Sequence, residues 1–267
     1  MKIITLIENH VQLESLQAEH GLSILIDTGA EKILFDVGQS DLFIKNAIKL
    51  GIDIAEIDYV VLSHGHSDHT GGLYPFLQIN KKAKIFCKKE IFIPKYNKGD
   101  KFIGLPLQDN LLKERLVFID SVIELTGNIF IVPHIDIYNP DDTHFENLKK
   151  KVNDELLKDD MLDELFIVVK HKSKISILTA CSHRGITNIC KTAIDYFKFP
   201  VNAIIGGFHL KHSTVEQYQF IIDFLNSEIK PSLVGICHCT GIEKLASMKR
   251  DLNSYVFYNE TGKQLDL

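Results

Sequence analysis

The chain has 267 residues, enough to bury a large core, and its 45% hydrophobic and 24% charged residues are typical of globular proteins. Its 35 acidic and 30 basic residues give a net charge of −5, which offers no general attraction to a phosphate backbone, so we expect no nucleic-acid partner. The sequence has neither the apolar core of a secretory signal nor a membrane-length apolar run, so we expect a cytoplasmic protein without membrane association. Its five cysteines form no CxxC pair, so we expect reduced thiols.

Short apolar runs fill the N-terminal third. The segments "MKIITLIEN", "LSILIDTG" and "KILFDVG" predict strands joined by tight turns. The stretch 40–51 predicts an amphipathic helix with Ser40 or Asp41 as its N-cap and Gly51 as its stop. The segment "IDYVVLS" then predicts a buried strand in a sheet that is covered on both faces.

The middle of the chain differs in composition from both flanks. Residues from about 84 to 164 are rich in lysine and end in the charged stretch "FENLKKKVNDELLKDDMLDEL", for which we expect a helix. We interpret this segment as an inserted α/β subdomain, or lid, within a single domain that spans residues 1–267.

The second half of the chain repeats the pattern of apolar strands. The segments "LFIVVKH", "ISILTACSH", "NAIIGGFH" and "SLVGICHC" predict four strands, with helices at about 186–197 and 215–227 between them. Three of the four strands run into a histidine at the carboxyl end, which is where α/β proteins tend to place their sites.

The segment "SHGHSDHTGG", residues 63–72, concentrates possible metal ligands directly after a predicted strand. His64 and His66 can share one metal on the same loop, whereas Asp68 and His69 can serve a second metal at the start of the next helix. A solvated polar loop or a helix cap would explain one histidine, but not four such residues at HxHxDH spacing.

Two neighbouring features support this loop. The glycine pair at 71–72 permits close backbone packing behind the ligands. Asp36 in "LFDVG" stands alone in sequence, so we expect it to fix a loop beside the metals and not to be a ligand.

With these motifs, the sequence resembles the metallo-β-lactamase superfamily, in which HxHxDH follows an apolar strand. The segments "TACSHRGI", "GGFHL" and "CHCTG" are similar to the group named after dihydropterin–ribofuranosylaminobenzene-phosphate synthase. The resemblance implies an α/β fold, a four-layer αββα sandwich, with a binuclear metal site. Zinc is the usual metal of that site, and iron or manganese are possible from the ligand types.

The resemblance also assigns roles residue by residue. It implies six metal ligands: His64, His66 and His183 for the first metal, and Asp68, His69 and His238 for the second. Cys181 falls where the superfamily normally has a bridging aspartate. Three alternatives stay open there: bridging by water alone, a contribution from the Cys181 thiolate, or an inert buried cysteine.

Further residues have expected roles in catalysis and substrate binding. We expect Asp68 and His209 to be catalytic, His209 as a hydrogen-bond donor to a phosphate or an oxyanion, with a structural histidine as the alternative. Lys95, Tyr96 and Lys101 could contact an anionic or aromatic substrate, although a solvated lysine face is the alternative.

The resulting functional hypothesis is a metal-dependent hydrolase-type enzyme. Hydroxide held between two cations would attack an ester or phosphodiester bond in a small, phosphorylated or pterin-like substrate, the substrate class being implied by the resemblance alone. The rival hypotheses are a metal-binding sensor without turnover and a di-iron redox enzyme of the same fold. The sequence does not determine the oligomeric state.

Overall fold

The computed structural model describes residues 1–105, 112 and 114–267, which form two compact units. The first unit consists of Met1–Asp120, Glu146–Asp163 and Glu260–Leu267. The second consists of Ser121–Phe145 and Glu164–Asn259. Among the described residues, no helix combines the length and the hydropathy needed to cross a membrane.

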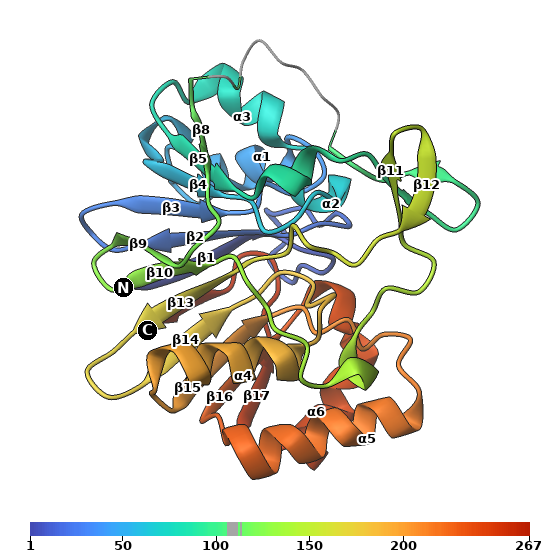
Figure 1. The fold of residues 1–267 in the computed structure, drawn as a ribbon. Coiled ribbons are helices and arrows are strands. Elements are labelled where there is room, and N and C mark those ends of the chain that lie inside the picture. The colour runs from blue at the N-terminus through green and yellow to red at the C-terminus, as the bar shows by residue number, and fades with distance from the viewer. Residues whose placement is uncertain (106–111, 113) are drawn as a thin grey trace. The chain divides into compact units, whose positions relative to one another are not determined.

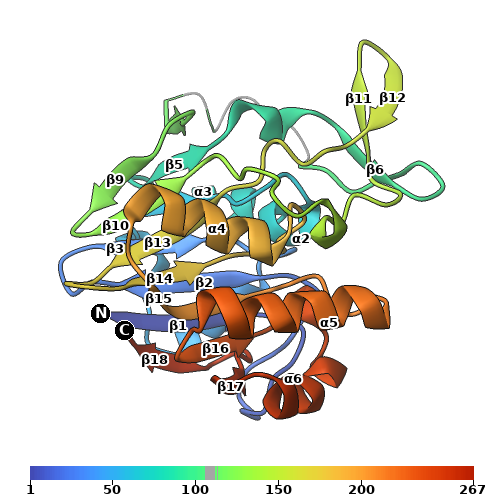
Figure 2. The same ribbon diagram turned by 60° about the horizontal axis from the view of Figure 1, so that its bottom comes forward.

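A seven-stranded sheet forms the framework of the first unit. In spatial order its strands are β18 (Gln264–Asp266), β1 (Lys2–Ile7), β2 (Ser23–Asp27), β3 (Lys32–Phe35), β4 (Tyr59–Val61), β5 (Lys84–Cys87) and β8 (Leu116–Phe118). The pairs from β18 to β3 are antiparallel, and those from β3 to β8 are parallel. Strands β1 to β4 confirm the N-terminal strands predicted from the sequence. Because β18 pairs with β1, the two chain ends lie side by side (Figure 2).

Short helices cover this sheet. They are α1 (Leu42–Lys49), α2 (Ser67–Thr70) and α3 (Leu73–Ile79), with 3₁₀ turns η1 (Ile54–Glu56) and η2 (Lys89–Phe92). Helix α1 buries Phe43 and Ala47 in the core of the unit and stops before Gly51, whose φ of +74° suits glycine. The N-cap residue is Asp41, whose side chain makes no cap hydrogen bond, and the hydroxyl of the preceding Ser40 accepts the Leu42 N–H at 3.1 Å.

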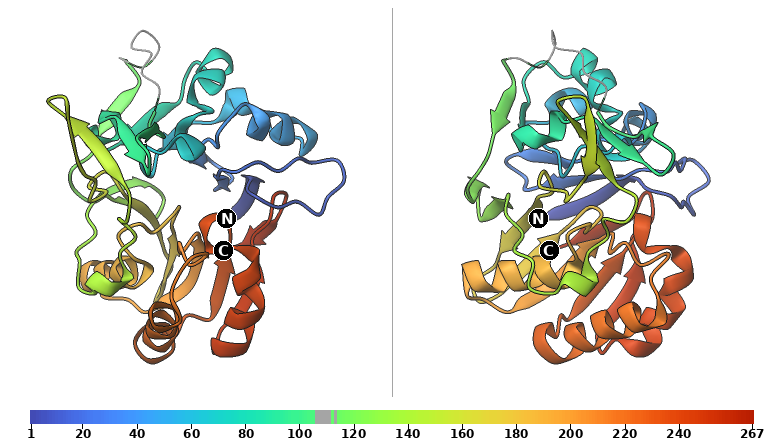
Figure 3. Two further views of the ribbon diagram at one scale, coloured as in Figure 1. Left: turned by 90° about the vertical axis from the view of Figure 1, so that its right-hand side faces the viewer. Right: turned by 45° about the vertical axis from the view of Figure 1, so that its right-hand side comes forward.

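A small four-stranded sheet also belongs to the first unit. Its spatial order is β12 (Glu155–Lys158), β11 (Lys149–Val152), β6 (Lys95–Asn97) and β7 (Lys101–Phe102). The helix expected in the charged stretch 145–165 is therefore wrong, because β11 and β12 form a hairpin there. Asn153 and Asp154, at its tip, have φ values of +49° and +65°, which their side chains tolerate in hairpin turns. Figure 3 shows this yellow-green hairpin projecting from its unit.

The middle segment 84–164 contributes strands to three sheets. It supplies β5 and β8 to the main sheet of the first unit and β6, β7, β11 and β12 to the small sheet. Its remaining strands, β9 and β10, join the sheet of the second unit. A role as a lid stays a prediction.

The second unit is built on another seven-stranded sheet. In spatial order its strands are β17 (Tyr255–Tyr258), β16 (Leu233–Ile236), β15 (Val201–Gly206), β14 (Ile175–Leu178), β13 (Phe166–Lys170), β10 (Ile129–Val132) and β9 (Ile123–Thr126). Strands β14 to β17 are parallel to one another, so their carboxyl ends meet at one edge. That edge carries the loops in which the sequence places its histidines.

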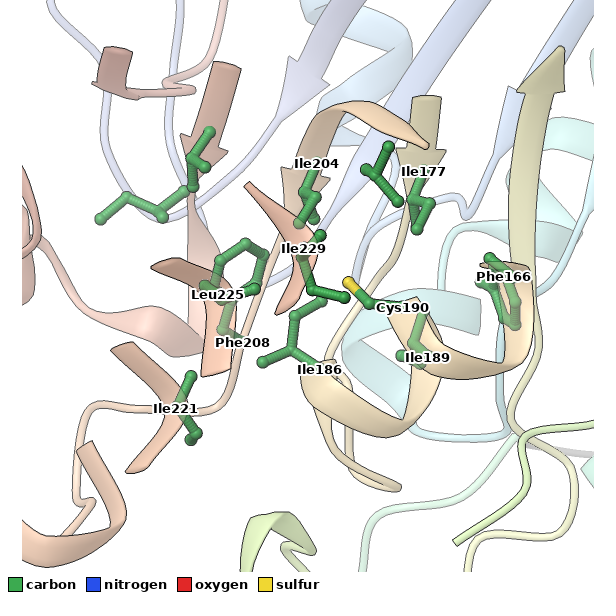
Figure 4. Packing of buried hydrophobic residues seen from close by; sticks show 14 of the residues in the cluster. Phe166, Ile177, Ile186, Ile189, Cys190, Ile204, Phe208, Ile221, Leu225 and Ile229 are labelled. Carbon is green, nitrogen blue, oxygen red and sulfur yellow. The ribbon is translucent and has the colours of Figure 1, made fainter. Parts of the chain in front are cut away.

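Helices pack on this second sheet and close its core (Figure 1). They are α4 (Ile186–Phe197), α5 (Val215–Phe224) and α6 (Leu245–Asp251), with the shorter turns η4 (Pro140–Asp142), η5 (Leu225–Ile229), η6 (His238–Thr240) and η7 (Ile242–Lys244). Helices α4 and α5 confirm the two predicted helices. Figure 4 shows Ile189 and Cys190 of α4 packed among Phe166 and Ile177 of the sheet, all of them buried. This core holds the strand ends in fixed positions.

Candidate metal centre

The loop after β4 orients two histidine rings toward each other. The Ser63 hydroxyl donates to Asp36 Oδ2 at 2.7 Å, so its oxygen accepts from His64 Nδ1, 2.8 Å away. This arrangement leaves a lone pair on His64 Nε2, which lies 3.1 Å from Nδ1 of His66. Two nitrogens on one tetrahedral zinc are separated by about 3.3 Å, so the spacing suits a shared metal.

Burial keeps the second of these rings neutral. His66 is 6% exposed, and burial lowers its pKa to about 4. A neutral imidazole retains the lone pair that a metal requires. His66 therefore has the protonation state of a ligand at neutral pH.

Asp36 determines the orientation of His69. Its Oδ2 atom lies 2.7 Å from His69 Nδ1, and both side chains are inaccessible to solvent. Since Nδ1 donates to this carboxylate, His69 Nε2 is left as the ligand atom, and it lies 3.6 Å from Oδ2 of Asp68. Asp36 also accepts the Ser63 N–H at 2.7 Å, which confirms its predicted loop-fixing role. The exposed His20 lies 3.3 Å from Asp68, an interaction that the sequence did not indicate.

Gly65, between the two ligand histidines, is held by buried charges. Its N–H donates to Oδ2 of Asp163 at 2.7 Å. The Lys95 ammonium donates to Asp163 at 2.9 Å and to Asp159 at 2.6 Å. Burial alone lowers the pKa of Lys95, but the two carboxylates outweigh it and raise the pKa overall. A Cβ on Gly65 would lie 2.6 Å from the Ile91 carbonyl oxygen, so glycine is required.

This arrangement corrects the expected role of Lys95. Its side chain is 2% exposed and its ammonium is engaged by two carboxylates, so it supports the metal loop from inside and does not face a substrate. Tyr96 is half-buried against Phe102, with ring centroids 5.6 Å apart, whereas Lys101 is exposed on β7. The sequence cannot separate the buried lysine from the exposed one, because all three expected contacts lie in one polar stretch.

Backbone packing behind the cluster agrees with the prediction made for the glycine pair. A Cβ on Gly71 would lie 2.2 Å from the carbonyl oxygen of Gln39, and one on Gly72 would lie 2.1 Å from that of Val37. The segment after β7 also reaches the cluster, since the Ser67 N–H donates to the Ile103 carbonyl at 2.7 Å.

In the second unit, Cys181 and His183 lie on the loop after β14. Both are buried, and the loop is held by Glu164, whose two carboxylate oxygens accept the N–H groups of His183 and Arg184 at 2.7 Å each. Glu164 directly follows Asp163 in sequence, so adjacent carboxylates each brace a histidine loop of their own unit. In the sequence, Asp163 and Glu164 are two acidic residues in a highly charged stretch, and nothing in that stretch predicts their roles.

His209, after β15, lies among other histidines. Its ring centroid is 4.6 Å from that of His183 and 4.8 Å from that of His144, on which it stacks. His144 is buried, and its Nε2 atom lies 3.6 Å from Oδ1 of Asp142. His144 lies outside the predicted strand ends, so no sequence pattern indicated a role for it.

His238 begins the 3₁₀ turn after β16 and is 2% exposed. Its ligand atom and the sulfur atoms of Cys181 and Cys239 lie within 4.8 Å of one another. The described structure therefore gathers His64, His66, Asp68 and His69 in the first unit and Cys181, His183, His209 and His238 in the second. Cys239 joins the second group, although no motif predicted a role for it.

Both groups have the donor chemistry of metal ligands. Neutral imidazole, carboxylate and thiol groups bind Zn²⁺, and the Asp36–His69 pair matches the carboxylate–histidine arrangement that orients metal-bound imidazoles. The residues present thus have the donor types and the close spacing that a metal ion requires.

Comparisons with known proteins agree with this geometry. The family model of the metallo-β-lactamase superfamily matches residues 16–153. A protein of Methanocaldococcus jannaschii named 7,8-dihydropterin-6-methyl-4-(beta-D-ribofuranosyl)-aminobenzene-5'-phosphate synthase is 31% identical over 265 residues, covering 91% of this chain and 88% of its own length. An uncharacterized protein of the same organism is 29% identical over 98% of both chains.

Solved structures give the same result. The crystal structure of Tm1679, described as a metal-dependent hydrolase of the beta-lactamase superfamily, matches with a TM-score of 0.88 and 32% identity, over 100% of this chain and 99% of that one. A diphosphatase of the PhnP family matches over 100% and 97% of the chains at a TM-score of 0.56 and 13% identity, which shows a shared fold alone. The expected α/β fold of the metallo-β-lactamase type is confirmed, and the chain belongs to the metallo-β-lactamase superfamily.

Proposed function

We propose that the protein is a binuclear, zinc-dependent hydrolase-type enzyme that acts on a small phosphorylated or pterin-like molecule. The observation that carries this proposal is the pair of ring nitrogens on His64 and His66, 3.1 Å apart at the end of an apolar strand. The similar relatives support it, because one is named as a synthase of a ribofuranosyl-aminobenzene phosphate and another is described as a metal-dependent hydrolase.

Six residues would hold the metals in this proposal: His64, His66 and His183 for the first, and Asp68, His69 and His238 for the second. When bound, the two ions would lower the pKa of a bound water to about 7 and so supply hydroxide at neutral pH. Iron or manganese would use the same donors, with the choice depending on metal availability.

The remaining side chains have distinct tasks in the proposed reaction. His209, which lies against His183, would donate a hydrogen bond to a phosphate or to the oxyanion that develops during attack. Asp36 would keep the His69 ring oriented, and Asp163 would keep the Gly65 peptide in position.

Tyr96 and Lys101 are proposed as substrate contacts. Both belong to the pair β6–β7, and the backbone just beyond β7 bonds to Ser67 next to His66. If a substrate is bound at the metals, Lys101 would contact an anionic group on it and Tyr96 would contact an aromatic group.

The test combines elemental analysis with a turnover assay. Protein purified without added metal is compared with His64→Ala and, as a matched control, with His212→Ala, a histidine outside both groups. The proposal predicts about two zinc ions per chain, fewer in His64→Ala, and an unchanged content in the control. Turnover of phosphodiesters, phosphate monoesters and pterin-type phosphates by the wild type should be lost in His64→Ala.

Two results would contradict this proposal. If wild type and His64→Ala contain the same amount of metal, the histidine cluster around His64 is not a metal site. Two metals without turnover of any of these substrates would instead support the metal-binding sensor.

A further inference from the structure

Three soft or borderline donors meet at the carboxyl edge of the second sheet. The sulfur atoms of Cys181 and Cys239 and a ring nitrogen of His238 lie within 4.8 Å of one another. Cys181 follows β14 and the other two follow β16, with β15 between them in a parallel arrangement. The parallel register therefore brings both loops to the same edge.

Local contacts hold the two cysteine loops together. The Cys239 thiol donates to the carbonyl oxygen of Cys181, with the sulfur and oxygen 3.4 Å apart. The Phe208 N–H donates to the Thr240 hydroxyl oxygen at 2.9 Å, which fixes the residue after Cys239.

The loop after β15, between the two cysteine loops, leaves space for the sulfur atom. A Cβ on Gly207 would lie 2.6 Å from Cys239 Sγ, so only glycine permits this placement. The Ser182 hydroxyl donates to the Gly207 carbonyl at 2.7 Å and holds this glycine against the Cys181 loop. The position of the Cys239 thiol is thus defined by all three loops.

We propose that Cys239 is a further metal ligand, which completes a set of two thiolates and one imidazole with Cys181 and His238. The inference rests on the proposed function, which already assigns His238 to a metal. Two sulfur atoms bound to the same zinc ion at about 2.3 Å each are about 3.8 Å apart, and the three donor atoms here lie within 4.8 Å of one another, so the group needs to contract by about 1 Å or less to bind. Binding would release the two thiol protons to solvent, and the thiolates would favour Zn²⁺ over harder cations.

The thiolate pair gives Cys181 a defined chemical role. At the position where the superfamily normally carries a bridging aspartate, this chain has a sulfur, and the second sulfur from Cys239 lies beside it. Two thiolates place as much negative charge next to the metal as two carboxylates would, while selecting a softer ion.

Absorption spectroscopy of the cobalt-substituted protein tests whether Cys181 and Cys239 bind the metal. Thiolate ligands produce charge-transfer bands that imidazole and carboxylate ligands do not. The comparison uses wild type, Cys239→Ser, Cys181→Ser and the control Cys237→Ala, whose thiol lies outside the three-donor group. We expect Cys239→Ser and Cys181→Ser each to lose about half of the thiolate band, and Cys237→Ala to keep it.

Alkylation provides a second measurement that needs no variant. Cys239 is half-exposed, whereas the other four cysteines are buried. Iodoacetamide should therefore modify one thiol per chain in the metal-free protein, at Cys239, and the addition of zinc should protect it.

The outcomes separate this inference from the proposed function. Cobalt bound at full stoichiometry with an unchanged band in Cys239→Ser, or equal alkylation with and without zinc, overturns the role of Cys239 and leaves the proposed function standing. A wild type that binds neither zinc nor cobalt overturns both.

Discussion

The Oδ2 atom of Asp163 accepts the backbone N–H of Gly65 at 2.7 Å, at the peptide that joins the two ligand histidines of the HxH loop. The carboxylate is inaccessible to solvent and shares the Lys95 ammonium with Asp159. The buried cluster of Lys95, Asp159 and Asp163 thus holds the backbone between His64 and His66, two proposed metal ligands.

Replacing Asp163 tests this support. Asp163→Ala leaves the buried Gly65 N–H without its acceptor, so we expect a loss of about 1–3 kcal/mol in the free energy of unfolding and weaker metal binding. Asp163→Asn retains an oxygen that can accept the same N–H, and should lose less of both. Urea unfolding of the metal-free proteins and metal titration provide the comparison. Equal losses in the two variants would show that the charge of Asp163, and not its hydrogen bond, is what matters.

Removing the central cation should have a larger effect. Lys95→Met leaves Asp159 and Asp163 buried without a counter-charge, for which we expect about 3–5 kcal/mol of destabilisation. The exposed Lys101→Met is the matched control and should change the free energy of unfolding by about 0.5 kcal/mol or less. Similar values for the two variants in urea unfolding would contradict the assigned role of Lys95.

The same lysine predicts a pH dependence of stability. Because the folded-state pKa of Lys95 is raised above 10.5, its contribution is complete below that value and is lost as the pH rises through the raised pKa. The difference in unfolding free energy between wild type and Lys95→Met should therefore be constant from pH 7 to 9 and shrink in strongly alkaline solution. A difference that grows with pH would have the wrong sign for a buried ammonium.

Asp36 offers a test of ligand orientation. Asp36→Asn keeps a residue type that tolerates the φ of +59° at this position, but removes the carboxylate that receives His69 Nδ1–H. We expect metal affinity to fall about 10–100-fold with little change in the fold. Competition of each protein with a chromophoric chelator measures the affinity, and circular dichroism monitors the fold. An unchanged affinity would make Asp36 a loop residue only.

His209 separates binding of metal from turnover. His209→Ala should retain full metal content, since the proposed ligands are all present, but lower kcat by about 10²–10³ if the imidazole stabilises a developing oxyanion. Elemental analysis and steady-state kinetics on the same preparation give both values. A loss of metal together with activity would indicate that His209 acts through His183, against which its ring lies.

The sequence by itself determined the class of site and most of the regular structure. Apolar runs that end in histidines predicted the strands β4, β14, β15 and β16 and their loops, because buried strands must be apolar and parallel strands align their carboxyl ends. The HxHxDH spacing identified the cluster, since consecutive ligands on one loop depend only on local geometry. The loop-fixing role of Asp36 was also predictable, because a single charged residue at the end of an apolar strand typically bonds to the adjacent loop.

Only the tertiary structure decided the roles of Lys95, Asp163, Glu164 and Cys239. Lys95 and Lys101 lie in the same polar stretch, and only the fold shows that one is buried between two carboxylates while the other is exposed. The hairpin β11–β12 replaced an expected helix because Asn153 and Asp154 have positive φ values, which reverse the chain between the two strands and which an α-helix does not contain. Such contacts join residues up to 98 positions apart, and no local pattern records which distant loop a carboxylate or a thiol will meet.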